Sequence, residues 1–150
     1  MIAARCLVDT NVLVYAYDRS QPVKQRRAFE VFDCFAMSAR GALSAQILSE
    51  FFVVVTRKIS DPLPVRDAVR SVENYLRAWP VLAITPPLIY EALRGTEQNR
   101  MPYWDALIWA TAKLNQIPAI LTEDFQDGRV LEGVRFVNPF TDDESVFEIL

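Results

Sequence analysis

Four acidic residues of this chain stand inside or beside apolar segments, where a charged carboxylate is costly unless a partner compensates it. They are Asp9, Glu50, Asp105 and Asp124. The chain contains no histidine, so a histidine-based triad or dyad is excluded. If the four acids converge, the natural partner is a hard divalent cation, because Mg²⁺ and Mn²⁺ prefer oxygen ligands. The predicted chemistry is therefore metal-assisted.

Three of these acids also have an ordinary structural explanation. Asp9 precedes an apolar helical pattern, where Asp is a common N-cap. Asp105 lies in a predicted first helical turn, where the helix dipole favours negative charge, and Glu50 could be a solvated helix residue. However, no Lys or Arg stands three or four residues from Glu50, and apolar residues flank Asp105 on both sides. Thr10 and Asn11 add further oxygens beside Asp9. The functional interpretation is favoured for all three.

The fourth acid has competitors in the same turn. Glu123, Asp124 and Asp127 are three acids in five residues, and such a run is usually solvated. Asp124 follows the end of a predicted strand most closely, so we select it and keep Asp127 as the alternate. The hydroxyl of Thr122 is a further candidate donor or ligand at this point.

Short β-like runs alternate with longer helical patterns along the chain. The expected strands are 6–8, 42–44, 81–84, 119–122 and 134–137, and the expected helices are 22–37, 45–57, 65–78, 86–94 and 102–115. We expect a loop over 95–101, or a further helical turn within it, and assign no element to the acidic tail 141–150. This alternation predicts an α/β fold of three layers (α/β/α), with a central, mostly parallel sheet covered by helices on both faces.

The fold class predicts where the acids meet. In parallel sheets of this kind, ligands bind beyond the carboxyl ends of the strands. Asp9 and Asp124 each follow a predicted strand, and Asp105 stands at the start of a helix. The sequence therefore predicts that these three acids lie along one edge of the sheet.

Side-chain patterning gives expectations for the rest of the surface. In the helix over 22–37, the apolar side is expected to contain Val23, Phe29, Val31, Phe32 and Phe35, while Lys24, Arg26, Arg27 and Glu30 face water. The three basic residues of this set could instead touch phosphates. The tryptophans and phenylalanines are expected to lie mostly in the core.

Length and composition limit the class of protein. A chain of 150 residues fits one domain over 1–150, and 51% hydrophobic residues exclude a disordered chain. A net charge of −3 lacks the strongly basic character of a protein that wraps duplex DNA. Cys6 and Cys34 stand far apart, without metal-site spacing, and are expected to be reduced. We expect a cytoplasmic protein, because no signal peptide and no apolar run of about 20 residues is present.

The four acidic stretches together resemble the motifs of one known family. LVDTNVLVYAYD, ILSEFFVVVTRK, DALIWATA and AILTEDFQDG are similar, in this order, to the four motifs of the PIN-domain ribonucleases. The resemblance is specifically to VapC-type toxins of bacterial and archaeal toxin–antitoxin pairs. It places the family's acids on Asp9, Glu50, Asp105 and Asp124. The fourth motif varies within the family, which leaves Glu123 as a further alternative there.

The resemblance carries expectations about fold and activity. It implies a single PIN-like domain, Mg²⁺ or Mn²⁺ dependence, RNA as the substrate, homodimerisation and inhibition by a cognate antitoxin. The predicted function is a metal-dependent endoribonuclease toxin. Asp9, Asp105 and Asp124 would be metal ligands, and Glu50 would bind metal or orient the attacking water.

Two other functions remain open at this stage. One is a phosphatase with Asp9 as the nucleophile, although such enzymes want a second aspartate two positions on, and here that residue is Asn11. The other is a non-enzymatic binding module, whose acidic pocket receives a basic side chain from a protein partner.

Overall fold

Six short strands form one sheet in the order β3-β2-β1-β4-β6-β5. In this computed structural model, which describes residues 4–150, the strands are β1 (Cys6–Val8), β2 (Gly41–Ser44), β3 (Val81–Leu82), β4 (Ala119–Leu121), β5 (Val130–Leu131) and β6 (Val134–Val137). All neighbours pair in parallel except β5, which is antiparallel to β6. The prediction of a mostly parallel sheet is therefore confirmed, although the short strand β5 was not expected.

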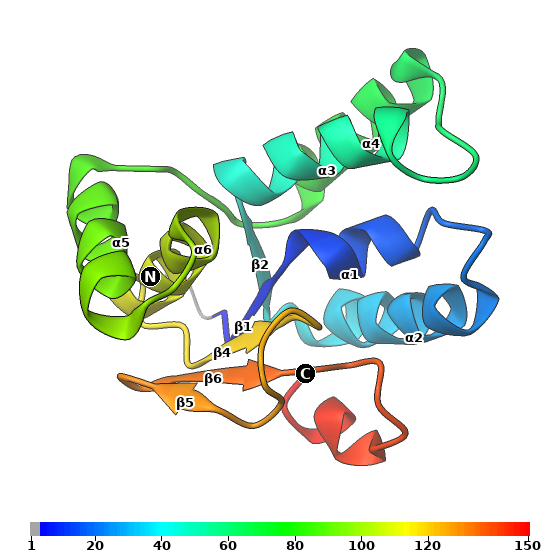
Figure 1. Ribbon diagram of the computed structural model, residues 1–150. Helices are drawn as coiled ribbons and strands as arrows, with labels where there is room; N and C mark the ends of the chain where they lie inside the picture. The colour runs from blue at the N-terminus through cyan, green and yellow to red at the C-terminus, as the bar shows by residue number, and fades with distance from the viewer. Residues whose placement is uncertain (1–3) are drawn as a thin grey trace.

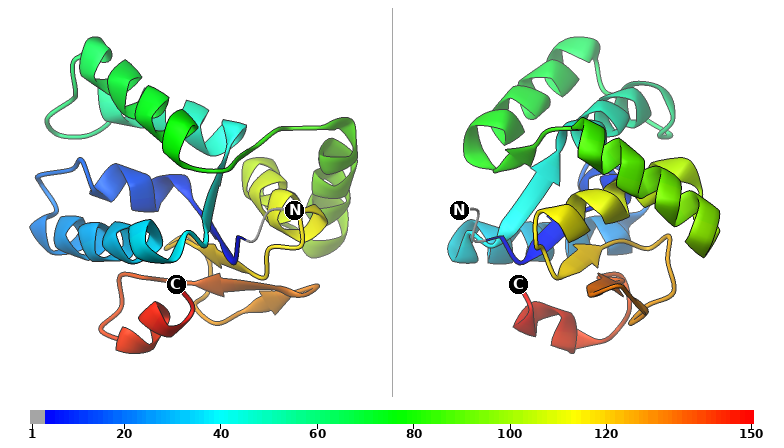
Figure 2. Two further views of the ribbon diagram at one scale, coloured as in Figure 1. Left: turned by 180° about the vertical axis from the view of Figure 1, so that it is seen from behind. Right: turned by 90° about the vertical axis from the view of Figure 1, so that its left-hand side faces the viewer.

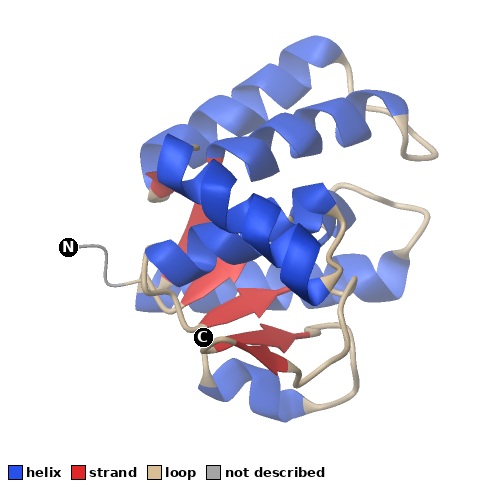
Figure 3. Cartoon of the chain, turned by 60° about the vertical axis from the view of Figure 1, so that its left-hand side comes forward, coloured by secondary structure: helices blue, strands red, loops and turns tan. Residues whose placement is uncertain are grey.

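Helices cover both faces of this sheet (Figure 1). They are α1 (Thr10–Tyr15), α2 (Pro22–Ser38), α3 (Ala45–Arg57), α4 (Val65–Ala78), α5 (Pro86–Asn99), α6 (Tyr103–Leu114) and the 3₁₀ helix η1 (Glu144–Glu148). Figures 1 and 2 place α5 and α6 on one side of the strands and α1, α2 and α3 on the other, with α4 outside α3. Figure 3 shows the strands enclosed between these helical layers. The three-layer α/β/α prediction is confirmed.

Local sequence explains where the helices near the site begin. Ser44 ends β2 in an extended conformation, and its side-chain oxygen accepts a hydrogen bond from the Ile47 N–H, so it is the N-cap of α3. Pro22 occupies the first turn of α2, where its missing N–H costs nothing. These short signals place the start of each helix directly after its strand or loop.

The strand order contains a reversal between β1 and β4. The chain proceeds outward from β1 to β2 and β3, and then α5 and α6 carry it back to β4 on the other side of β1. In doubly wound sheets, such a reversal opens a crevice beyond the carboxyl ends of the two strands. Asp9 follows β1 and Asp124 follows β4, so both lie at this crevice.

In the core, α5 and α6 pack closely against each other, and α5 is longer than expected. Trp109 of α6 is fully buried, and a Cβ atom added to Gly95 of α5 would lie 2.8 Å from Trp109 Cζ3. Glycine at position 95 therefore permits the close approach of two helices. Of the expected loop over 95–101, residues 95–99 are helical, which agrees with the alternative of a further helical turn, and α5 ends at Asn99.

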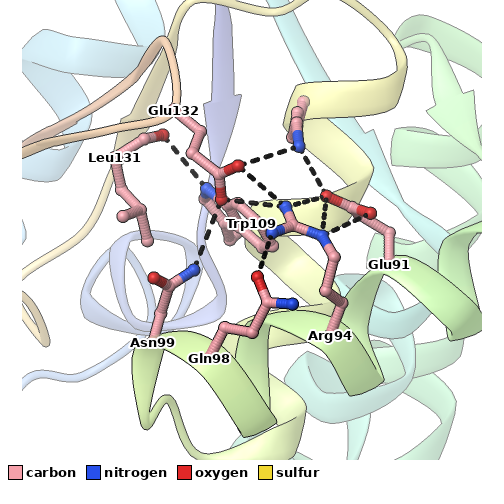
Figure 4. A network of polar contacts seen from close by, with 8 residues as sticks. Glu91, Arg94, Gln98, Asn99, Trp109, Leu131 and Glu132 are labelled. Atoms are coloured by element: carbon pink, nitrogen blue, oxygen red, sulfur yellow. Dashed lines mark hydrogen bonds and ion pairs between the residues drawn. The ribbon is translucent and has the colours of Figure 1, made fainter.

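Four charged side chains fasten α5, α6 and the turn after β5 to one another (Figure 4). Arg94 lies 2.5 Å from Glu91 and 2.8 Å from Glu132, and Lys113 lies 2.5 Å from Glu91. Both cations also lie over the Trp109 ring, at 5.6 Å for Arg94 and 5.2 Å for Lys113. The network is balanced in charge and holds the helical layer from which α6 approaches the site.

The surface of α2 differs from its expected pattern. Val23 is 80% exposed and Phe29 is 50% exposed, whereas Ala28, Val31 and Phe35 are buried. The first turns of α2 extend past the strands (Figure 1), so an apolar residue there finds no sheet to cover.

Arg27 is also not a solvated residue. Its side chain is 11% exposed, and it donates hydrogen bonds to the carbonyl oxygens of Pro139 (2.7 Å) and Asp143 (2.9 Å). It thereby fastens the acidic tail, which contains η1, against α2.

Neither Cys6 nor Cys34 forms a disulfide. Within residues 4–150, no helix is long and apolar enough to cross a bilayer.

Candidate functional site

Asp9 lies at the end of β1 and is only 3% exposed. One carboxylate oxygen accepts a hydrogen bond from the Thr10 backbone N–H (2.7 Å), and the other accepts one from the Thr122 hydroxyl (2.8 Å). The first of these bonds makes Asp9 the N-cap of α1. Asp9 can therefore both cap α1 and belong to the candidate site, because each role uses a different carboxylate oxygen.

The charge of Asp9 lacks a cationic partner. Within residues 4–150, no lysine or arginine forms an ion pair with it. Burial raises the pKa of this carboxyl to about 7, against the hydrogen bonds from Thr122 and Thr10, and the charges of Asp124 and Glu50 raise it further. A cation bound at this position would remove that penalty.

Asn11 joins the ends of β1 and β4. Its Nδ2 lies 3.0 Å from Asp124 Oδ2 and 3.4 Å from Asp9 Oδ2, and 3.2 Å from the Thr122 hydroxyl oxygen. One amide group therefore bridges two carboxylates that are 115 positions apart in the chain. Thr122 and Asn11, which the sequence indicated only as neighbouring polar groups, organise this part of the site.

The three candidates for the fourth acid have different surroundings. Glu123 forms an ion pair with Lys24 at 2.8 Å, so that lysine is not free to contact a phosphate. Asp127 accepts a hydrogen bond from the backbone N–H of Asn138 at 2.9 Å. Asp124 alone of the three lines the cleft described below. The structure therefore brings Asp124, rather than the other two, next to Asp9.

Glu50 lies on α3, six residues after the end of β2. Its Oε2 accepts a hydrogen bond from the Thr10 hydroxyl (3.0 Å), and its Oε1 accepts one from Gln46 Nε2 (3.0 Å). Gln46 also donates to the backbone carbonyl of Trp104 (2.9 Å). Sequence reasoning missed this role of Gln46, although its position four residues before Glu50 in a helix was the signal.

Asp105 occupies the first turn of α6 and is half-buried. Burial raises the pKa of its carboxyl, and the charges of Asp124 and Glu50 raise it further. Because α6 runs antiparallel to the strand that follows it, its N-terminal turn faces the same sheet edge as Asp9. All four predicted acids are thus gathered around the crevice at the strand reversal.

The four acids lie near one another but do not form a complete metal site in this structure. Within residues 4–150, no three acidic or cysteine side chains lie close enough to hold one ion as they stand. The donor set nevertheless suits Mg²⁺ or Mn²⁺, because it consists of oxygen atoms only. Gln46 Oε1 is buried and has no hydrogen-bond partner in the described part of the chain. The residues fit such an ion in two respects: their donor atoms are all oxygens, and their negative charge is not compensated.

A cleft of about 980 Å³ opens beside these acids. Glu50 and Asp124 line it near the sheet edge, together with Trp104, and it extends along α3 to Lys58. Asp9 is buried and does not line this cleft. The volume of the cleft lies at the upper end of the range for ligand pockets, which is about 300–1,000 Å³.

Comparison with known proteins identifies similar sequences and folds. A family model described as PIN domain matches residues 6–130, a segment that contains all four acids. A comparison with curated protein sequences found no significant match.

Solved structures with a similar fold include three from bacteria. A toxin–antitoxin complex from Klebsiella pneumoniae is 21% identical, covering 89% of this chain and 97% of that one, with a TM-score of 0.63. DNA-bound VapBC from Salmonella typhimurium is 16% identical over 89% and 96% of the chains (TM-score 0.63). The Sarcin-Ricin loop cleaving toxin VapC20 of Mycobacterium tuberculosis is 17% identical over 77% and 86% (TM-score 0.56). At such identities the likeness concerns the fold.

Proposed function

This chain belongs to the PIN domain family, and from that premise we propose that it is a metal-dependent endoribonuclease, the toxin of a toxin–antitoxin pair. One observation carries the proposal furthest. A buried carboxylate without a cationic partner, Asp9, lies at the strand reversal of the sheet with Glu50, Asp105 and Asp124 around it. The solved structure of similar fold that is named a Sarcin-Ricin loop cleaving toxin supports RNA as the substrate.

We assign Asp9, Asp105 and Asp124 as ligands of Mg²⁺ or Mn²⁺. Such an ion, when bound, lowers the pKa of water and polarises phosphoryl oxygens. Asp9 Oδ2 is on the side of Asp124, because it accepts from the Thr122 hydroxyl and from Asn11 Nδ2, which also donates to Asp124, whereas Oδ1 caps α1. Asn11 holds Asp124 at the same point through a 3.0 Å hydrogen bond.

We assign Glu50 either to orient and deprotonate the attacking water or to bind the metal directly. The hydroxyl of Thr10 and the amide of Gln46 each engage one oxygen of this carboxylate, which fixes its plane and leaves a lone pair on each oxygen to accept a proton. With no histidine in the chain, a carboxylate at the cleft wall is the natural general base.

The proposed partners are an RNA, a cognate antitoxin and a second copy of the chain. Solved structures of similar fold are toxin–antitoxin complexes, and a basic antitoxin side chain entering the acidic cleft would neutralise it. Homodimerisation is supported by exposed apolar residues on α5, where Ile89 is 39%, Tyr90 76% and Leu93 50% exposed. Light scattering of the purified protein, with Tyr90→Lys as the comparison, tests the dimer.

A phosphatase mechanism has less support. The residue two positions after Asp9 is Asn11, whose amide donates to carboxylates and cannot act as an acid or base. A covalent phosphoryl adduct trapped on Asp9 would reverse this judgement. A purely binding role makes no use of the buried Asp9, since a partner's side chain would meet the exposed acids first.

The decisive experiment is RNA cleavage by the purified protein, free of any partner. We expect cleavage with Mg²⁺ or Mn²⁺, none with EDTA, and none by Asp9→Asn. Asp142→Asn, at an exposed acid of the C-terminal segment, is the matched control and should cleave normally. Cleavage that survives chelation or persists in Asp9→Asn would refute the metal mechanism. Sequencing of RNA ends after brief expression of each variant would then identify the target.

A further inference from the structure

An exposed tryptophan stands at the mouth of the acidic cleft. Trp104 is 61% exposed, although the tryptophans were expected in the core, and it lines the same cleft as Glu50 and Asp124. It immediately precedes Asp105 in the first turn of α6. An exposed indole beside charged groups gives up the free energy of burial, so its position calls for a ligand with an apolar, flat surface.

The position of Trp104 is fixed relative to the acids. Its backbone carbonyl accepts a hydrogen bond from Gln46 Nε2 (2.9 Å), and the same amide nitrogen donates to Glu50 (3.0 Å). The ring of Tyr103 packs edge-on against the indole, with ring centroids 5.1 Å apart. A group stacked on Trp104 would therefore be held at a constant place with respect to Glu50 and Asp105.

The opposite end of the cleft carries a cation. Lys58 is the C-cap of α3, eight residues after Glu50, which corresponds to about 12 Å of helix. It is exposed and forms no ion pair with an acid in the described part of the chain. The cleft thus offers an aromatic face at one end, carboxylates next to it, and a free ammonium at the other.

We propose that this cleft holds one unpaired RNA strand, with a base stacked on Trp104 and a phosphate on Lys58. The inference rests on the proposed ribonuclease function and assigns two residues of this chain that contact the RNA. A stacked base must expose its face, which a duplex hides between neighbouring pairs, so RNA recognised in this way is single-stranded or looped out. Apolar residues between the ends, Val53 and Ile84, are both partly exposed along the cleft and suit the flat faces of further bases.

The charges of the cleft wall give an RNA strand little general electrostatic attraction. Asp18, Glu50 and Asp124 repel phosphates along the wall, and only Lys58 attracts them there. A strand therefore gains little from general electrostatic attraction, and stacking on Trp104 supplies a large share of its affinity. This makes the effect of Trp104 substitutions large enough to measure.

The test is a titration of intrinsic fluorescence with a short unstructured oligoribonucleotide, in an Asp9→Asn background that leaves the RNA intact. We expect quenching, because a stacked base contacts an indole directly. Trp104→Phe should abolish the quenching and retain most of the affinity. Trp104→Ala should weaken binding roughly 5- to 150-fold, the range for one aromatic–base stack. Trp79→Phe, which alters a half-buried indole outside the cleft, should keep the quenching. The same strand annealed to its complement should bind far more weakly.

The lysine has its own readout. Lys58→Gln should lower the dependence of log affinity on log salt by about 0.7, the value for one phosphate contact of a single strand, whereas Trp104→Ala should leave that slope unchanged. Lys113→Gln, which removes a lysine paired with Glu91 and Glu132, should not alter the slope.

Several results would overturn the inference. These are unchanged RNA affinity in Trp104→Ala, equal binding of duplex and single strand, or a Trp104→Ala variant that loses only antitoxin binding or dimerisation. The failure of the ribonuclease proposal is a different result. In that case the wild-type protein does not cleave RNA with Mn²⁺, while the quenching and its loss in Trp104→Phe still establish the strand-binding cleft.

Discussion

Replacing Asp9 with Asn should stabilise the metal-free protein at alkaline pH. The pKa of this buried carboxyl is about 7, whereas its ordinary value is 3.8. A difference of about 3 in pKa corresponds to about 4 kcal/mol between the two protonation states. Above pH 7 the folded chain holds an unfavourable charge, which the amide of similar shape does not carry.

The net gain is smaller than this figure. The asparagine oxygen can still accept from Thr10, but its NH₂ group must meet the Thr122 hydroxyl and the Asn11 amide, which now donate to Oδ2. A disturbed buried hydrogen bond costs about 1–3 kcal/mol. We therefore expect Asp9→Asn to raise the free energy of unfolding by about 1–3 kcal/mol at pH 8.

The sign of the pH dependence follows from the raised pKa. The folded chain binds this proton more tightly than the unfolded chain, so the contribution of Asp9 to wild-type stability is fully present below about pH 4 and is lost as the pH rises to about 7. This contribution is absent from Asp9→Asn. Urea denaturation in EDTA, repeated from pH 4 to pH 8, measures it as a shift of midpoint at constant slope.

Two controls make the measurement specific. Asp142→Asn, at an exposed acid, should follow the wild-type curve at every pH. The reasoning is refuted if the stabilities of wild type and Asp9→Asn change in parallel between pH 4 and pH 8, or if Asp9→Asn is the less stable protein at pH 8.

Three further predictions follow from other parts of the molecule. Mn²⁺ at about 100 times its dissociation constant should stabilise the wild type by about 2.7 kcal/mol, and Asp9→Asn should lose this gain in a thermal melt. Glu91, whose pKa hydrogen bonds from Arg94 and Lys113 hold near 2, should contribute stability above about pH 4.5 that disappears as the pH falls towards 2. In acid denaturation, Glu91→Gln should therefore differ from wild type near neutrality and converge with it in strong acid. Gly95→Ala should destabilise the protein by about 1–3 kcal/mol despite the better helix propensity of alanine, because the new Cβ would lie 2.8 Å from a ring carbon of Trp109; an unchanged urea midpoint would contradict the close packing.

Sequence reasoning located most elements because their signals are local. Ser44 as an N-cap, Pro22 in a first turn and the buried run Cys6–Val8 each act within a few residues. Local reasoning failed where a distant partner decides. The segment 95–101, expected mainly as a loop, is helical to Asn99. There the backbone of Gly95 in α5 packs against the ring of Trp109 in α6, a contact that neighbouring residues do not reveal.

The candidate site shows the same division. The order and spacing of the four acidic motifs, together with the absence of histidine, were sufficient to predict an oxygen-only site at one sheet edge. They favoured Asp124 only because of its place after a predicted strand, and left Asp127 and Glu123 as alternatives. Their ranking depends on groups far away in sequence, because Lys24 pairs with Glu123 and Asn138 donates to Asp127.

The sequence by itself therefore determined the α/β fold and the family, and it proposed the set of acids, since periodicity, caps and motif order are properties of neighbouring residues. Tertiary structure decided which acid joins Asp9, how Gln46 and Asn11 hold the carboxylates, and that Trp104 faces the cleft rather than the core. The physical reason is that burial and hydrogen-bond partnership are set by the crossing of α3, α6 and the strand ends. No local pattern in the chain encodes that crossing.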